Sequence, residues 1–161
     1  MSNPNHHDIK VLNGLIETTL DSADGYHEAA AETEDTRYQL VFEQRSFERR
    51  SLAVDLQETV RALGGQPDLD GSILAKAQRA FTDVKHALLR DELTVVAAVE
   101  SGEDRMKARF EKALEDSDIS ATTREAIRRA YASVAEGHDQ MRDLKHSLEG
   151  RRDADSPLFP H

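Results

Sequence analysis

The chain has 161 residues, enough for one domain with a buried core, and no cysteine, which excludes disulfides, thiolate metal ligands and cysteine nucleophiles. With 31 acidic and 21 basic residues its net charge is −10, which disfavours binding to a phosphate backbone. The basic stretch at residues 45–50 alternates with acidic side chains and is interpreted as a solvated helix face, so we expect no nucleic-acid partner.

Residues 1–7 are polar and are expected to form a flexible N-terminal tail, with Asp8 as the cap of the first helix. That helix is predicted over residues 8–33, because small or apolar side chains recur there at alternating intervals of three and four residues. Such spacing is typical of a helix packed in a bundle. The inward seam consists of Ile9, Leu12, Ile16, Thr19, Ala23, Tyr26 and Ala30.

A second helix is predicted over residues 36–63, with Asp35 or Thr36 as its cap. The stretch "GGQPDLDG" at residues 64–71 should end it, since paired glycines terminate helices and Pro67 prevents continuation. The expected apolar positions of this helix are Leu40, Phe42, Phe47, Leu52, Leu56, Val60 and Leu63.

A third helix is predicted over residues 72–115, with a bend or break near Gly102, and a fourth over residues 121–149, with Gly150 as its stop signal. Residues 150–161 are expected to form a flexible C-terminal tail. The inward stripe of the fourth helix consists of Ile127, Tyr131, Val134, His138, Met141 and Leu148. Four long helices with short connections predict an all-α four-helix bundle over residues 8–149.

Two glycines inside helical patterns directly precede polar residues of interest. Gly102 precedes Glu103 and Gly137 precedes His138, and each glycine costs about 1 kcal/mol of helix stability relative to alanine. A bulge or a close approach of another helix would explain both glycines. The simpler alternative for Gly102 is that it ends a helix.

Four segments together carry a resemblance to a known family: "LNGLIETTLDSADGYHEAAAE", "FEQRSFERRSLAVDLQETVRALGGQPDLDGS", "VESGEDRMKARFEKAL" and "EGHDQMRDLK". They resemble the bacterial domain of unknown function 2383, a ferritin-like family. The resemblance spans about residues 11–148 and implies a bacterial, ferritin-like four-helix bundle without an established activity. It also implies dimers or larger assemblies, and it leaves a stress-related role open.

Di-iron members of the wider ferritin-like group place one Glu on each of two helices and a Glu-x-x-His motif on each of the other two. Carried over by the resemblance, this template retains only three ligands: Glu48, Glu103 and His138. The remaining template positions fall on Thr19, Ser51 and Ala135, which cannot bind iron in the same way. A shift by one helical turn would bring in Asp21, Glu100, Glu136 or Asp139 instead.

Two interpretations of these residues follow. The three ligands could hold a divalent metal such as iron, in a single-metal or di-iron protein with an iron-handling or oxidase function. Alternatively, the polar centre is a hydrogen-bonded cluster, in which Glu48 and Glu103 pair with His138 or with arginines such as Arg45 and Arg49. We favour the second, which predicts a cytoplasmic, non-catalytic or weakly metal-binding module without catalytic residues or a resident cofactor. A third hypothesis is an adaptor bundle that binds a protein partner through its C-terminal tail.

Overall fold

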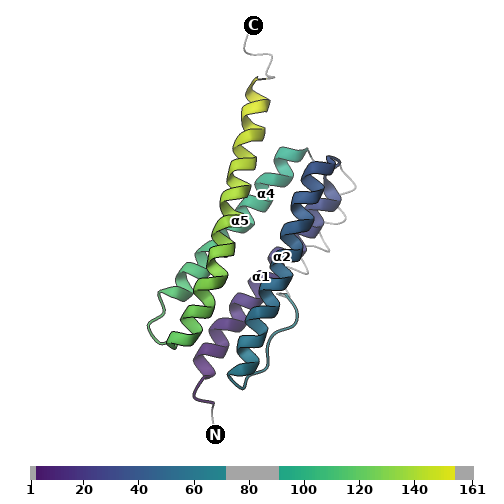
Figure 1. Ribbon diagram of the computed structural model, residues 1–161. Helices are drawn as coiled ribbons and strands as arrows, with labels where there is room; N and C mark the ends of the chain where they lie inside the picture. Colours follow the sequence, from purple (N-terminus) through teal and green to yellow (C-terminus); the bar gives the residue numbers. More distant parts are fainter. Residues whose placement is uncertain (1–2, 72–90, 155–161) are drawn as a thin grey trace.

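The computed structural model describes residues 3–71 and 91–154, which form four helices (Figure 1). These are α1 (His6–Glu32), α2 (Thr36–Ala62), α4 (Glu92–Leu114) and α5 (Ala121–Ala154). Neighbouring helices are α1 with α2, α4 with α5, α1 with α4, and α2 with α5, so the expected four-helix bundle is confirmed. None of the described helices combines the length and apolar character needed to cross a bilayer.

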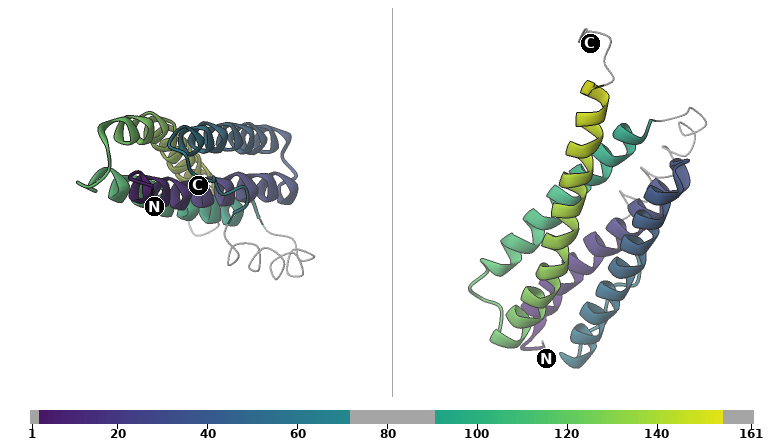
Figure 2. Two further views of the ribbon diagram at one scale, coloured as in Figure 1. Left: turned by 90° about the horizontal axis from the view of Figure 1, so that it is seen from below. Right: turned by 45° about the horizontal axis from the view of Figure 1, so that its top comes forward.

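The helices form two antiparallel hairpins, α1 with α2 and α4 with α5. In Figures 1 and 2, α2 ends near the start of α1, whereas α4 begins at the opposite end. The start of α1 lies beside the start of α5, where the Asp8 carboxylate accepts hydrogen bonds from the Ser120 N–H and the Thr123 hydroxyl. The first and last helices are therefore parallel, an arrangement that the sequence alone left open.

Local sequence determines most of the helix ends. Asp35 is the cap of α2, because its carboxylate accepts the Arg37 N–H at 2.9 Å. Gly64 ends the same helix with φ +83°, a conformation that only glycine adopts without strain. The expected role of Asp8 was different, since it lies inside α1 and caps the start of α5 instead.

Several helix bounds differ from the predicted ones, beginning with α1, which starts at His6 within the expected N-terminal tail. Helix α4 begins at Glu92 after the cap residue Asp91, and residues 72–90 of the predicted third helix lie outside the described residues. The helix runs through Gly102 without a break. Helix α5 continues through the predicted stop at Gly150 to Ala154, so the first residues of the expected tail are helical.

The core consists of two apolar clusters at the two ends of the bundle. One includes Leu12, Ile16, Phe110 and Ile127, and the other surrounds Tyr26, Phe42, Val96 and Met141. Each fully buried side chain of this size contributes about 1.5–3 kcal/mol to folding. The layer between the two clusters is polar, and the candidate site lies there.

The apolar pattern of α2 was only partly predictive. Phe42, Leu52, Leu56 and Val60 are buried as expected, but Leu40 and Phe47 are 61% and 76% exposed. Polar residues face the core in their stead, since Arg45, Ser46, Arg49 and Gln57 are buried. The interpretation of residues 45–50 as a solvated face was therefore wrong for Arg45 and Arg49.

Candidate functional site at the bundle centre

A buried ion pair between Arg49 of α2 and Glu103 of α4 occupies the polar layer. The Arg49 Nη1 donates to Glu103 Oε1 at 2.8 Å, and Nη2 donates to Oε2 at 2.7 Å, so that the two planar groups meet fork to fork. Arg49 is 0% exposed and Glu103 is 1% exposed. Because α2 and α4 stand at opposite corners of the bundle, the pair joins the two hairpins across its centre.

The surrounding side chains complete the environment of the guanidinium group. Its Nη1 also donates to the Ser22 hydroxyl at 3.0 Å and contacts the Met106 sulfur at 2.8 Å. The guanidinium carbon lies 5.6 Å from the centre of the Tyr26 ring, a cation–π distance. The Tyr26 hydroxyl and the Arg49 Nε are buried without a hydrogen-bond partner among the described residues.

The electrostatics of the layer favour a permanent positive charge on Arg49. Burial alone would lower its pKa, but the facing Glu103 carboxylate outweighs burial and raises the pKa above the ordinary arginine value. Burial, together with the Glu103 charge, also raises the pKa of Tyr26, so its phenol stays neutral. The layer therefore holds one fixed cation opposite the Glu103 carboxylate.

Gly137 of α5 is what allows α5 to close over this pair. A Cβ atom at this position would lie 2.3 Å from Arg49 Nη2 and 3.1 Å from Glu103 Oε2. The close approach that the sequence suggested for Gly137 is therefore present. No close approach requires a glycine at position 102, since a Cβ at Gly102 would make only an ordinary contact at 3.7 Å with Arg105.

The three predicted metal ligands lie in three different pairings. Glu103 is bound to Arg49, as described. Glu48 points further outward, with a side chain that is 38% exposed, and it accepts two hydrogen bonds from Arg45 at 2.9 and 2.7 Å. His138 lies 2.6 Å from the Asp104 carboxylate. The carboxylate–arginine pairing expected from the sequence is present, but His138 pairs with another acid.

The other template positions are also accounted for. Thr19 is fully buried, and its hydroxyl donates to the Leu15 carbonyl of its own helix. Ser51 is exposed, and Ala135 is partly buried. Of the alternative ligands, Glu100 lies 3.0 Å from Lys145, and Asp139 lies 3.4 Å from His138.

One group of side chains elsewhere has the spacing of metal ligands. Among residues 3–71 and 91–151, only His7, Asp116 and Asp118 bring three candidate ligand atoms within 4.8 Å of one another. His7 Nε2 already lies 2.7 Å from Asp116 Oδ2, and the Asp118 N–H binds the other oxygen of Asp116. The sequence interpretation gave His7 no role because it placed residues 1–7 in a flexible tail, and Asp116 lies 109 residues further along the chain.

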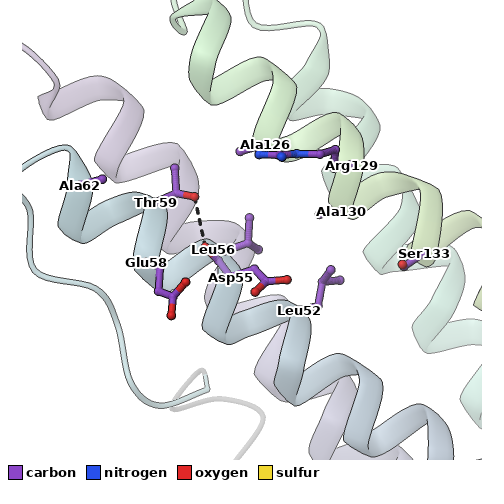
Figure 3. A pocket seen from close by; sticks show the side chains of 10 residues that line it. All are labelled: Leu52, Asp55, Leu56, Glu58, Thr59, Ala62, Ala126, Arg129, Ala130 and Ser133. Atoms are coloured by element: carbon purple, nitrogen blue, oxygen red, sulfur yellow. Dashed lines mark hydrogen bonds between the residues drawn. The ribbon is translucent and has the colours of Figure 1, made fainter.

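A groove separates α2 from α5 near one end of the bundle (Figure 3). Its volume is about 570 Å³, and its floor is formed by buried Leu52, Leu56 and Ala130. Asp55 and Glu58 lie on its α2 side, and Arg129 lies on its α5 side. The two helices thus stand apart here and contact each other further along, where Gly137 lies over Arg49 and Arg45 donates to Gln140.

The family model named "Domain of unknown function (DUF2383)" matches residues 7–116 of the chain. The fold is similar to that of a dodecameric thioferritin, the bacterioferritin-related protein from Bacteroides fragilis. The TM-score is 0.73 at 16% identity, and 93% of this chain and 90% of that chain are covered. It is also similar to a mutant of Dps1 from Mycobacterium smegmatis, with a TM-score of 0.71 at 13% identity, covering 90% of this chain and 99% of that chain. No curated protein matches the sequence. The chain belongs to the DUF2383 family and has the fold of the ferritin-like four-helix bundles.

Proposed function

We propose that this protein is a self-associating, non-catalytic ferritin-like module in which an internal ion pair has replaced the metal centre. One observation carries the proposal: the Arg49 guanidinium binds both carboxylate oxygens of Glu103 inside the bundle, at 2.8 and 2.7 Å. A divalent cation at Glu103 would have to displace a charge that is covalently part of the chain. It would also meet the electrostatic repulsion of that charge in a buried environment.

The donor set supports the same conclusion. A di-iron site needs several carboxylates to neutralise two hard cations, whereas only Glu103 is fully buried in the described part of this layer. Glu48 is held by Arg45, and His138 is held by Asp104, so neither side chain joins Glu103 in a common ligand set. The residues present therefore do not fit an iron pair in this arrangement.

Self-association is supported by the assembly of a structural neighbour, since the protein from Bacteroides fragilis is dodecameric. The competing function, iron handling, is favoured by a different observation: His7, Asp116 and Asp118 have the spacing to hold a single divalent ion at the end of the bundle. An adaptor role of the C-terminal segment stays a prediction, because residues 155–161 lie outside the described residues.

Metal analysis of protein from iron-supplemented culture tests the proposal. We expect less than about half an equivalent of iron per chain and no oxygen uptake on adding ferrous iron. Two irons per chain with oxygen uptake would refute the proposal. Two variants locate any metal that is found. If Glu103→Gln loses the metal, the metal is bound at the centre, against the proposal. If Asp116→Asn loses the metal, it is bound at the His7 group, which supports the competing function.

A further inference from the structure

The outer face of α2 carries three large apolar side chains that no described residue covers. Leu40, Phe47 and Val54 are 61%, 76% and 47% exposed. They follow one another at intervals of seven residues, so at about 100° per residue they fall within roughly 40° of one another around the helix. The apolar stripe, as we name these three residues, is about 20 Å long and faces directly away from the core.

Charged side chains flank the apolar stripe in a pattern that has an internal symmetry. Glu43 and Arg50 lie on one flank, the first shortly before Phe47 in the sequence and the second about as far after it. Arg37 and Asp55 lie on the other flank, again before and after Phe47 with opposite charges. All four are exposed; the side chains of Arg37, Glu43 and Arg50 are 71%, 50% and 48% exposed.

We infer that the apolar stripe is a dimer interface, in which α2 of one chain packs antiparallel against α2 of a second copy around a two-fold axis at Phe47. In this arrangement the two Phe47 side chains meet on the axis, and each Leu40 packs against the partner's Val54. In antiparallel helix pairs each flank meets the same flank of the other helix. Glu43 therefore faces the partner's Arg50, and Arg37 faces the partner's Asp55. The two-fold axis repeats each of these pairs once more.

The charge pattern distinguishes this arrangement from a parallel one. In a parallel pair, one flank meets the opposite flank at the same height, so that Glu43 would face a neutral Gln44 and Arg50 a neutral Ser51. The antiparallel pair places each of the four charges opposite an unlike charge, with Glu43 and Arg50 as the main pair, since Arg37 is already bound to Asp35 at 2.8 Å. The ion pairs that Glu43 and Arg50 make within their own chain, with His27 at 3.2 Å and Asp24 at 2.9 Å, leave both heads about half exposed for a second partner.

This inference rests on the self-association in the proposed function, and it adds the surface and the symmetry. It does not depend on the absence of metal from the centre. The charge pattern provides a test that needs no assumption about the size of the assembly. Glu43→Arg places two like-charged pairs across the interface, and Arg50→Glu does the same with the opposite sign.

Sedimentation velocity of the full-length chain should show association for the wild type. Each single variant should raise the apparent dissociation constant at least about tenfold, because two attractive pairs become repulsive. Mixing the two variants should restore association as a heterodimer, because the wholly basic flank of Glu43→Arg then faces the wholly acidic flank of Arg50→Glu. Glu125→Arg on the exposed surface of α5 is the matched control and should associate like the wild type.

Phe47→Asp tests the apolar part, with Leu69→Asp as its control, since Leu69 is 67% exposed but lies outside the stripe. Loss of association in Phe47→Asp alone supports the interface. A wild type that is monomeric would refute both the inference and the proposed self-association. Association that survives Phe47→Asp, or that mixing the two charge variants does not restore, would refute this interface and leave self-association through another surface standing. Circular dichroism of every variant confirms that it is folded.

Discussion

Gly137→Ala offers the sharpest test of the central layer, because alanine is ordinarily the better helix residue. In an unconstrained helix this change stabilises by about 1 kcal/mol. Here the new methyl group would lie 2.3 Å from Arg49 Nη2, far inside van der Waals contact. Arg49 is fully buried and bound at both Nη atoms to Glu103, so its head cannot swing away as an exposed arginine would.

The size of the expected destabilisation follows from the ion pair that the new methyl group would disrupt. Disrupting a buried ion pair costs about 3–5 kcal/mol, and the gain in helix propensity offsets about 1 kcal/mol of this. We therefore expect Gly137→Ala to lower the free energy of unfolding by about 2–4 kcal/mol. Urea denaturation followed by circular dichroism, at one fixed protein concentration, measures this change.

Gly14→Ala and Gly25→Ala are the matched controls. Both glycines lie inside α1, and a Cβ at either position would meet nothing within 4 Å. Each control should therefore be neutral or stabilising by up to about 1 kcal/mol. If Gly137→Ala were as stable as these controls, α5 would not be packed against the ion pair, and the reasoning about the central layer would fail.

Two further predictions concern buried polar groups. Burial raises the pKa of Asp8, but hydrogen bonds from Ser120 and Thr123 outweigh it, and the pKa lies below the ordinary value. Asp8 therefore stabilises the fold above its unfolded pKa of about 3.9, and this contribution is lost as the pH falls through the lower folded pKa. Asp8→Asn should flatten the fall in stability below about pH 4 in urea titrations, and an unchanged pH dependence would contradict this. The Tyr26 hydroxyl is buried near the Glu103 carboxylate but makes no hydrogen bond of good geometry with it, so Tyr26→Phe should keep the ring contact with Arg49 and stabilise by about 1 kcal/mol. A loss of stability of that size in thermal unfolding would show that the hydroxyl has a partner.

Hydrophobic periodicity predicted α1 well, because that helix buries small and apolar side chains on one face. Leu12, Ile16, Ala23 and Tyr26 are all buried as expected. The same rule was only partly predictive for α2, because the core face also carries Arg45, Arg49 and Gln57. The outer face of that helix carries Leu40 and Phe47. Both faces of α2 mix apolar and polar side chains, so its sequence shows no clear amphipathic pattern, and only the packed structure shows which face points inward.

The site was predictable in its parts and in its kind of pairing, carboxylate with arginine, but not in which carboxylate faces which arginine. Glu103 was identified through the family resemblance, and Gly137 was singled out by its cost in a helix. Glu48 is the position that the family template places at the centre, but its neighbour Arg49 is the buried one. One residue rotates a helical position by about 100°, enough to exchange a buried place for a half-exposed one. Which of two adjacent charged residues points inward depends on contacts with α4 and α5, and a single helix sequence carries no record of those contacts.

The central ion pair also affects how the bundle holds together. The pair joins α2 to α4, which belong to different hairpins and stand at opposite corners of the bundle. Buried ion pairs add little net stability compared with apolar side chains, but they penalise every packing in which one charge is left alone. In this bundle, a slip of one hairpin against the other by a helical turn would separate Arg49 from Glu103 inside an apolar core. The centre therefore selects one register between the hairpins. A bound metal could do the same, but only while it stayed bound, whereas the Arg49 charge cannot dissociate or change oxidation state.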